Sequence, residues 1–373
     1  MDQTKTERGL MSEKINQVEP NISEQDAQKV NDYMSSGAWI TEHALTKELE
    51  DNIADFVGRK YAVAVPNGTI AIYLSLLAAG LTEGKRVAVP NITMIATINA
   101  ILWAGADPVI IDLNDRLCMS LKSLQSVEKL DGVIYVPLNG RTEDGIAIEN
   151  YCKEKNIILI EDSAHALGSE YQEKMCGSLG SLSVFSFTPH KIITMGQGGL
   201  VLTDDDNLYE YLISLKTFNR SKDKSDWHEG FGLNFKITDL QSALGLSQFE
   251  KINEFINVKK EMFQIYKNEI MNYKFIDFFN YETPWFIDLI CESVIDRDML
   301  RTGLEEEAEI LTRESYPALS KQNFLKNVEK TNLEFSESIA EKILWLPSST
   351  NLTKNQLEEV SKKIEFIYTN KGK

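Results

Sequence analysis

The sequence predicts an α/β fold, in which a large domain with a mostly parallel seven-stranded sheet precedes a smaller α+β domain. Short β-branched runs alternate with helical patterns, which is typical of βαβ units. The chain of 373 residues exceeds the length that one hydrophobic core usually supports. After about residue 255 the sequence becomes richer in Lys, Glu and Asn. We therefore expect an N-terminal arm and large domain over 1–255, and a small domain over 256–373.

The individual elements follow from local patterns. The first expected helix covers SEQDAQKVNDYMSSG, in which Ser23 is an N-cap and Gly37 ends the helix. The expected strands are 61–65, 86–89, 109–112, 133–137, 157–161, 183–187 and 199–203. A long helical region is expected at 239–270, where it leads into the second domain. Three shorter helices are expected at 296–308, 335–342 and 354–369. The first 15 or so residues look loosely specified.

The charge balance bears on the class of partner. The chain has 39 Lys and Arg against 56 Asp and Glu, a formal charge of −17, which opposes non-specific attraction to nucleic acid or an anionic membrane. The most apolar stretch, RVAVPNITMIATINAILWAGADPVIIDL, is interrupted by Pro90, Asn91, Asn99 and Asp107, so it predicts a buried strand–helix–strand and not a membrane span. We expect no nucleic-acid or membrane partner, and a local site for any anionic ligand.

The cysteines and the N-terminus indicate the compartment. Neither close pairing nor metal-ligand spacing is present among Cys118, Cys152, Cys176 and Cys291. The polar start MDQTKTERGL lacks the apolar core of a signal peptide. We expect a cytoplasmic protein without a metal site.

The turn after the first expected strand is a candidate phosphate site. In PNGTIAIYLSLLAAG, Gly68 and Thr69 open an amphipathic helix, whose free N-terminal amides can bind an anion, and Thr69 adds a hydroxyl. The alternative is a simple turn with an N-cap at Asn67. The turn alone does not decide between the two.

A buried strand that ends in two acids is a second candidate. In NIILIEDSAHALG, Asp162 lies where ligands bind in parallel sheets, beyond the carboxyl end of a strand. Asp162 could cap the following helix, or it could pair with a protonated heteroaromatic nitrogen. His165 follows three residues later and could stack on such a ring or serve as a structural histidine.

Lys191 is the candidate catalytic residue. It follows SVFSFTPH, an apolar strand that contains Ser186, and precedes IITMGQGGLVL, whose glycines permit tight turning. A lysine that is desolvated in such a place becomes a nucleophilic amine suited to Schiff-base chemistry, whereas most lysines are solvated surface charges. A phosphate-binding turn, an acid for a ring nitrogen and a nucleophilic lysine are the groups that pyridoxal phosphate requires.

Three motifs in this order resemble a known family. EDSAHALG, SFTPHK and GLNFK, within EDSAHALGSEYQEKMCGSLGSLSVFSFTPHKIITMGQGGLVLTDD and GFGLNFKITDLQSALGLSQFEKI, resemble the sugar aminotransferases of the DegT/DnrJ/EryC/StrS family. The resemblance extends from about residue 20 to the C-terminus and includes GAWITEHALTKELEDNIADFVGRKYAVAVPNGTIAIYLSLLAAGL and the late TRESYPAL. It implies an aspartate-aminotransferase-like fold and pyridoxal 5'-phosphate as cofactor.

The resemblance also implies roles for individual residues. Lys191 would form a Schiff base with the cofactor and Asp162 would pair with its pyridinium nitrogen, with His165 beside the ring. The residues implied to hold the cofactor phosphate are Gly68, Thr69, Ser186 and, from the second subunit of a homodimer, Asn234. Arg313 and Tyr316 of TRESYPAL could line the acceptor side, or could be a surface arginine and a packing tyrosine.

Some positions depart from the family pattern. Met94 stands where the family usually has an aromatic ring against the cofactor, and a methionine is softer and more adaptable there. Lys236 replaces the usual Arg, and Phe218-Asn219 stands where His-Gly is common. These changes leave the cofactor chemistry intact but weaken any transfer of a particular substrate specificity.

The expected reaction is ping-pong transamination, with glutamate as the donor and a nucleotide-linked 4-keto-6-deoxy sugar as the acceptor, for surface polysaccharide or a related glycan. A small phosphorylated ketone or a cyclitol is an alternative acceptor. A sugar dehydratase of the same fold is a second alternative, but such relatives replace the lysine with histidine, and Lys191 is present here. A non-catalytic binding module would not require Lys191 and Asp162 together.

Overall fold

The larger of the two main sheets forms the middle layer of the molecule. The computed structural model describes residues 14–371, so most of the loosely specified N-terminal stretch lies outside the described residues. The sheet has eight strands in the order β1-β9-β8-β5-β4-β2-β3-β13. In that order the strands are β1 (Tyr61–Val65), β9 (Gly199–Thr203), β8 (Leu182–Ser186), β5 (Ile158–Asp162), β4 (Gly132–Tyr135), β2 (Arg86–Pro90), β3 (Asp107–Ile111) and β13 (Glu329–Lys330).

All seven predicted strands are confirmed, with bounds that shift by at most two residues. β9 is antiparallel to both β1 and β8, and the other pairs are parallel. The eighth strand, β13, comes from late in the chain and extends the edge beside β3. Because β13 has only two residues, no periodic pattern marks it in the sequence.

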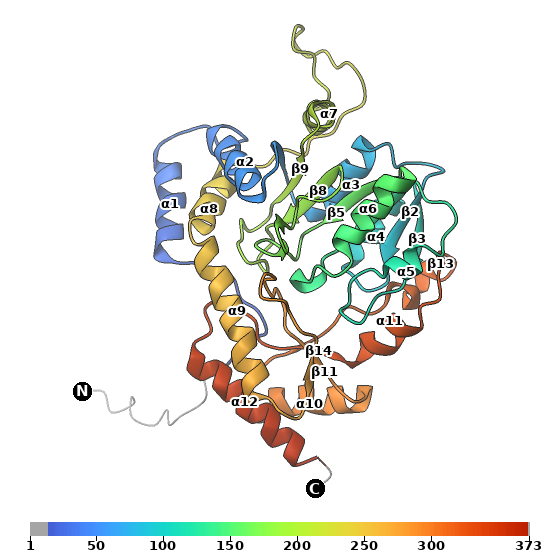
Figure 1. Cartoon of the computed structure of the whole chain (residues 1–373). Coiled ribbons are helices and arrows are strands. Elements are labelled where there is room, and N and C mark those ends of the chain that lie inside the picture. Colours follow the sequence, from blue (N-terminus) through green and yellow to red (C-terminus); the bar gives the residue numbers. More distant parts are fainter. Residues whose placement is uncertain (1–13, 372–373) are drawn as a thin grey trace, which may run out of the picture.

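Helices cover both faces of this sheet (Figure 1). In β1, Val63 and Val65 pack with α3, α4 and α7, whereas Ala62 and Ala64 on the other face pack with α2 and α8. This alternation follows from the two-residue period of a strand. The helices of this layer are α2 (Ala44–Val57), α3 (Gly68–Ala78), α4 (Ile95–Trp103), α5 (Leu121–Leu124), α6 (Gly145–Lys155), α7 (Asp206–Lys216) and α8 (Asp239–Phe249).

The predicted helices are present with two corrections, one at 239–270 and one after Asp162, where the chain forms turns and no helix. α1 (Glu24–Ser35) begins after Ser23, which forms a capping box with Asp26. The region 239–270 is not one helix, because the chain leaves helical geometry at Lys251, between α8 and α9 (Ile252–Glu269). The later helices are α10 (Val294–Ala308), α11 (Glu334–Ile339) and α12 (Lys354–Thr369).

A second, antiparallel sheet lies below the first in Figure 1. Its strands, in the order β10-β11-β14-β12, are β10 (Lys274–Phe275), β11 (Asp288–Ile290), β14 (Ile343–Trp345) and β12 (Arg313–Glu314). α9, α10 and α12 contribute to its core. The remaining elements are the hairpin β6 (Glu170–Tyr171) and β7 (Lys174–Met175) and the short 3-10 helices η1 (Leu138–Gly140), η2 (Leu319–Lys321), η3 (Asn323–Leu325) and η4 (Ala340–Lys342).

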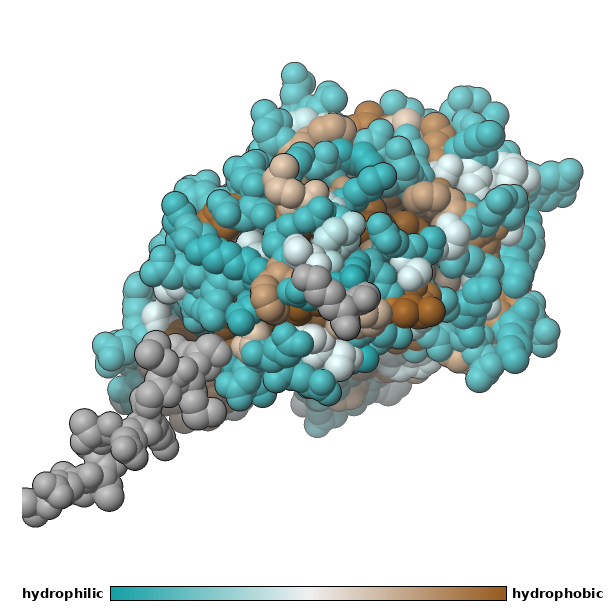
Figure 2. Space-filling model, turned by 90° about the horizontal axis from the view of Figure 1, so that it is seen from below, coloured by the Kyte–Doolittle hydropathy of each residue, from teal (hydrophilic) through white to brown (hydrophobic). Residues whose placement is uncertain are grey.

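The domain boundary at residue 255 stays a prediction. α9 crosses it, and β13 returns from the later part of the chain to the large sheet. No helix among residues 14–371 is long and apolar enough to cross a membrane. The face that Figure 2 shows is mainly hydrophilic, with apolar residues in separate patches.

Candidate active site

The strand register brings three of the predicted site segments to one edge of the large sheet. Gly199, at the start of β9, lies opposite both Val65 at the end of β1 and Ser186 at the end of β8. Asp162, the last residue of β5, pairs with Val184 of β8. The turn at Gly68, the acid and the end of β8 therefore meet where ligands bind in sheets of this type.

Lys191 lies in the loop between β8 and β9, which folds back on itself. The amide of Phe187 donates to Gly198 O at 2.8 Å, and the amide of Met195 donates to Phe187 O at 3.0 Å. A further turn is closed by the amide of Lys191, which donates to Thr188 O at 3.0 Å. These bonds hold the lysine beside the sheet edge although it belongs to no strand or helix.

The Lys191 amine and the Asp162 carboxylate influence each other's charge. Burial lowers the pKa of Lys191 to about 7, an effect that Asp162 opposes and that Arg313 reinforces. Burial raises the pKa of Asp162, whereas a hydrogen bond from Thr97, another from the backbone of Ala164 and the charge of Lys191 oppose that rise. The lysine is therefore a neutral nucleophile for much of the time near neutral pH.

Asp162 also serves the local structure. Its Oδ2 accepts from Thr97 Oγ1 at 2.8 Å, and its Oδ1 accepts from the amide of Ala164 at 3.3 Å. The helix-cap interpretation is wrong, because the chain between β5 and β6 forms turns and no helix; the second bond is long and leaves the carboxylate able to bind a cation. Sequence reasoning missed Thr97, which lies 65 residues earlier on α4.

The turn at the start of α3 is consistent with both interpretations of PNGT. Asn67 caps the helix, because its side chain accepts from the amide of Ile70 at 3.0 Å. A Cβ added to Gly68 would lie 2.9 Å from the Cβ of Ser186, so only glycine fits this close approach without a shift. The proposed phosphate contacts of Gly68, Thr69 and Ser186 stay predictions.

His165 is buried at 4% exposure and stacks on Trp285, with ring centroids 4.0 Å apart and an interplanar angle of 25°. Burial lowers the pKa of His165 well below its usual range, with Lys191 and Arg313 adding to the effect, so the ring is neutral. Its Nδ1 is buried and has no hydrogen-bond partner among the described residues. No local pattern in the sequence marks Trp285 as a partner of His165, because it lies 120 residues later in the chain.

The structure places Arg313 and Tyr316 beside the same cluster. The rings of His165 and Tyr316 have centroids 5.9 Å apart. The Arg313 guanidinium lies 5.8 Å from the Tyr316 ring and 5.4 Å from the Trp345 ring, and within residues 14–371 it forms no ion pair. It is exposed, so it is available to an anion.

Two predicted residues are placed less closely. Met94 is the N-cap of α4, where its sulfur accepts from the amide of Ala96 at 3.0 Å, and its side chain is exposed. Asn234 is exposed, and its backbone forms an isolated bridge with Thr217 at the end of α7, so the chain between these two residues forms a loop that projects from the body in Figure 1. The structure of one subunit does not bring Asn234 to Lys191.

The residues that the structure does bring together fit pyridoxal phosphate. The amine of Lys191 forms no hydrogen bond among the described residues, Nδ1 of His165 has no partner, and the glycine turn approaches Ser186 closely. Asp162 could supply the anion that a pyridinium nitrogen requires. The fold and this site define the chain as a pyridoxal-phosphate-dependent enzyme of fold type I.

The comparisons with known proteins identify the family. Residues 20–365 match the DegT/DnrJ/EryC1/StrS aminotransferase family, and the chain belongs to it. The resemblance in the sequence is thereby confirmed, and the chain is a pyridoxal-phosphate-dependent aminotransferase.

Similar proteins include two GDP-perosamine synthases. That of Escherichia coli O157:H7 is 31% identical over 366 residues, which is 95% of this chain and 98% of the relative. That of Vibrio cholerae is 30% identical over 92% of this chain and 96% of the relative. Among solved structures, Helicobacter pylori PseC, an aminotransferase involved in the biosynthesis of pseudoaminic acid, has a TM-score of 0.89 at 21% identity, over 96% of this chain and 100% of that chain. At this identity the structural likeness concerns the fold alone.

Proposed function

We propose that the enzyme transfers the amino group of glutamate to the ketone of a nucleotide-linked 4-keto-6-deoxy sugar, in the biosynthesis of surface polysaccharide or a related glycan. The observation that carries the proposal is the likeness to GDP-perosamine synthases over more than nine tenths of the chain. The exposed Arg313 guanidinium beside the Lys191 cluster supports it, because a sugar nucleotide brings a diphosphate into a protein of net charge −17.

The side chains of the site have distinct roles in this reaction. Pyridoxal phosphate, when bound, supplies a carbonyl that accepts amines and a conjugated ring that accepts an electron pair. Lys191 Nζ, an amine whose pKa burial lowers to about 7, would take the proton from Cα of glutamate and pass it to the cofactor within the first half-reaction, and would move a proton from the cofactor to the acceptor carbon in the second. The Asp162 carboxylate would hold a proton on the ring nitrogen, and the neutral His165 would lie beside the ring.

We assign the binding of the cofactor phosphate to residues from two subunits. Gly68, Thr69 and Ser186 would hold it from one subunit, through helix amides and two hydroxyls. Asn234 of a second copy would complete the site, which explains why it is exposed and lies away from Lys191 within one chain. Exposed aromatic side chains, Trp39 at 68% and Phe231 at 70%, provide apolar surface for such a homodimer.

The dimer is tested by complementation. Lys191→Ala and Asn234→Ala subunits are mixed after mild dissociation, and transaminase activity is compared with that of each variant alone. Hybrid dimers contain one site with neither substitution, so activity should recover to about a quarter of the wild-type value under random pairing. A fully active monomer at the assay concentration would contradict the shared site.

The acceptor is tested by comparing kcat/KM for nucleotide-linked 4-keto sugars and for small phosphorylated ketones, each with glutamate as donor. Nucleotide-linked sugars should be preferred by about a hundredfold or more. Arg313→Gln should narrow this preference, because Arg313 would bind the diphosphate of the sugar nucleotide. The small ketones carry a single phosphate and would lose less. A hundredfold preference for the small ketones would overturn the sugar assignment and leave the aminotransferase assignment intact.

A further inference from the structure

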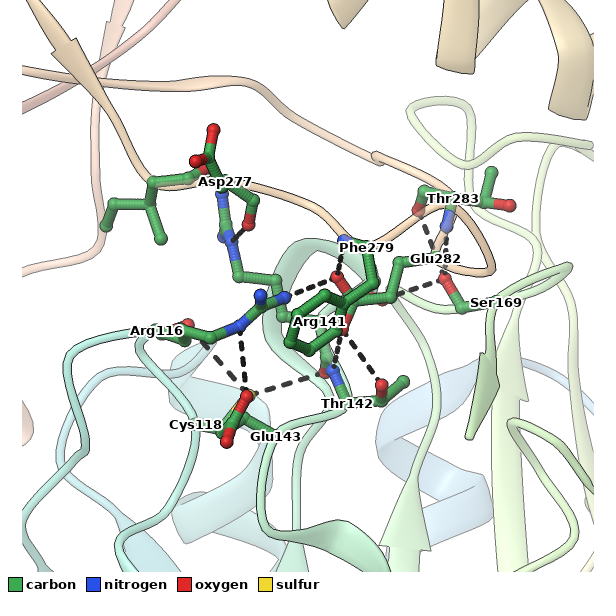
Figure 3. A network of polar contacts seen from close by, with 12 residues as sticks. Arg116, Cys118, Arg141, Thr142, Glu143, Ser169, Asp277, Phe279, Glu282 and Thr283 are labelled. Atoms are coloured by element: carbon green, nitrogen blue, oxygen red, sulfur yellow. Dashed lines mark hydrogen bonds and ion pairs between the residues drawn. The ribbon is translucent and has the colours of Figure 1, made fainter. Parts of the chain in front are cut away.

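The segment 279–285 is fastened to the loops that follow β3 and β4 of the large sheet. Figure 3 shows Glu282 at the centre of this contact. Its buried carboxylate accepts from the guanidinium of Arg116, from the amide of Thr142 at 2.8 Å, from Thr142 Oγ1 at 2.9 Å and from the amide of Phe279 at 2.7 Å. The guanidinium of Arg116 also lies 3.7 Å from the Phe279 ring. We call Glu282 with these partners the Glu282 latch.

A second set of contacts holds the chain directly after the latch. The amide of Thr283 donates to Ser169 Oγ at 2.7 Å, and Thr283 Oγ1 donates to Gly168 O at 2.7 Å. Gly140 has a φ of +92°, and a Cβ at this position would overlap the carbonyl of Thr283. The backbones therefore pass so closely that only glycine fits at residue 140.

Trp285 leaves this fastened segment and reaches the candidate active site. Its amide donates to Asn139 O at 3.0 Å, and its indole Nε1 donates to His190 O at 2.7 Å. These two bonds fix both the backbone and the ring plane. The ring then lies 3.9 Å from Lys191 Nζ and stacks on His165.

The contact with Trp285 is significant because the Lys191 amine has few others. Within residues 14–371 Nζ forms no hydrogen bond and no ion pair, and it lies over the indole ring of Trp285. An aromatic face favours an ammonium group over a neutral amine, and the effect grows where water is excluded. Trp285 therefore influences both the position of the amine and its protonation.

We propose that Trp285 is a positioning residue that holds the Lys191 side chain and the His165 ring in place, and that the Glu282 latch keeps Trp285 on Lys191. The proposal rests on the proposed function only for its catalytic consequence. The contacts belong to the free chain, so they can be tested in protein from which the cofactor has been removed. Its failure is then distinguishable from failure of the function.

The test measures the protonation of Lys191 in the full-length, cofactor-free protein. Brief acetylation with acetic anhydride between pH 5.5 and 10, followed by peptide mass spectrometry, gives the midpoint at which Lys191 becomes reactive. Trp285→Met keeps an apolar side chain but removes the ring, and should lower this midpoint by about one pH unit, a tenfold change. Trp285→Phe retains a ring face and should shift it by less than about half as much.

The latch is tested in the same assay. Glu282→Gln keeps the shape of the side chain but weakens its bond to Arg116, and should lower the midpoint by about half a unit. The double variant with Trp285→Met should show no more shift than Trp285→Met alone, because the latch acts through the indole. Asp26→Asn is the matched control, since Asp26 is an equally buried carboxylate that pairs with Lys251 at 2.6 Å.

The charged or titratable groups that face Lys191 are unchanged in all these variants: Asp162, Arg313, His165 and His190. A midpoint that stays the same or rises in Trp285→Met would overturn the role of Trp285. Additive shifts in the double variant, or an equal shift in Asp26→Asn, would overturn the role of the latch. Near-ultraviolet circular dichroism of each variant excludes unfolding as the cause.

Discussion

Lys191 and Lys259 are two lysines with similar pKa values in different parts of the molecule. Burial lowers the pKa of each to about 7. Lys259, on α9, is 3% exposed, its amine donates to the carbonyl of Ser348, and no other group adds to the effect of burial. Lys191 is half-buried, lies between the charges of Asp162 and Arg313 and has no hydrogen bond among the described residues.

The difference separates a reactive amine from a merely perturbed one. Both lysines have a neutral form near pH 7, Lys259 through desolvation alone and Lys191 through desolvation together with the opposing influences of Arg313 and Asp162. Chemistry also requires access for a substrate, a free lone pair and a neighbouring charge that can respond to the reaction. Lys191 meets these conditions, whereas the amine of Lys259 is engaged by a backbone carbonyl inside the core.

The largest expected effect comes from removing each lysine in turn. Lys191→Ala should lower the steady-state transamination rate by at least about ten-thousandfold, or more than about 5 kcal/mol, because the nucleophile and proton carrier is lost. Lys259→Met should retain activity within about threefold, because it lies outside the site. An equal loss of transamination rate in the two variants would show that Lys191 has no catalytic role that the buried Lys259 lacks.

The carboxylate beside Lys191 has the next largest expected effect. Asp162→Asn should lower the rate by more than about a hundredfold, roughly 3 kcal/mol, because an amide cannot hold the ring nitrogen protonated. Thr97→Val removes one donor to that carboxylate and should cost only about tenfold. Near-normal rates for Asp162→Asn would assign the residue to capping the backbone at Ala164 alone.

Lys259 should affect stability and not rate. The unfolded chain holds the proton on this lysine up to about pH 10.4, whereas the folded protein releases it near pH 7. The unfolded state therefore binds more protons between these values, and the Lys259 contribution to the free energy of unfolding rises with pH there. Lys259→Met should raise that free energy by about 2 kcal/mol at pH 6, and the gain should vanish towards pH 10.

Urea unfolding at a series of pH values measures this effect. The bond to Ser348 is lost in the variant, which offsets part of the gain by about 1 kcal/mol. A gain that is independent of pH would mean that the lysine is protonated equally in the folded and unfolded states.

The smallest expected effect is a difference in chemical reactivity between the two amines. In the cofactor-free protein, brief acetylation at pH 8 should modify Lys191 about tenfold faster than Lys259, since both are neutral at that pH but only Lys191 is accessible. Peptide mass spectrometry compares the two sites in one sample. Equal acetylation rates would show that accessibility does not distinguish the two amines.

Much of the fold could be predicted because six of the eight strands of the large sheet have five mostly apolar residues and are separated by turns or helices. β1, β5 and β9 each match such a run. The second sheet was predicted only as α+β, because its strands have two or three residues and carry no measurable period. The break at Lys251 was missed since no proline or glycine marks it.

The site divides in the same way. Lys191, Asp162 and Gly68 were predictable because each follows a strand and carries a local signal. Thr97 and Trp285 were not, because they reach the site only through contacts far apart in the sequence. A tryptophan in the apolar run TPWFIDL was the one available signal, and it predicts burial without naming a partner.

The central claim is that Lys191, and not the similarly perturbed Lys259, carries the cofactor. The most direct test is reduction of the pyridoxal-phosphate-loaded enzyme with borohydride, followed by digestion and mass spectrometric mapping of the cofactor adduct. The account predicts one adduct per chain, on Lys191. An adduct on Lys259 or on any other lysine would contradict it.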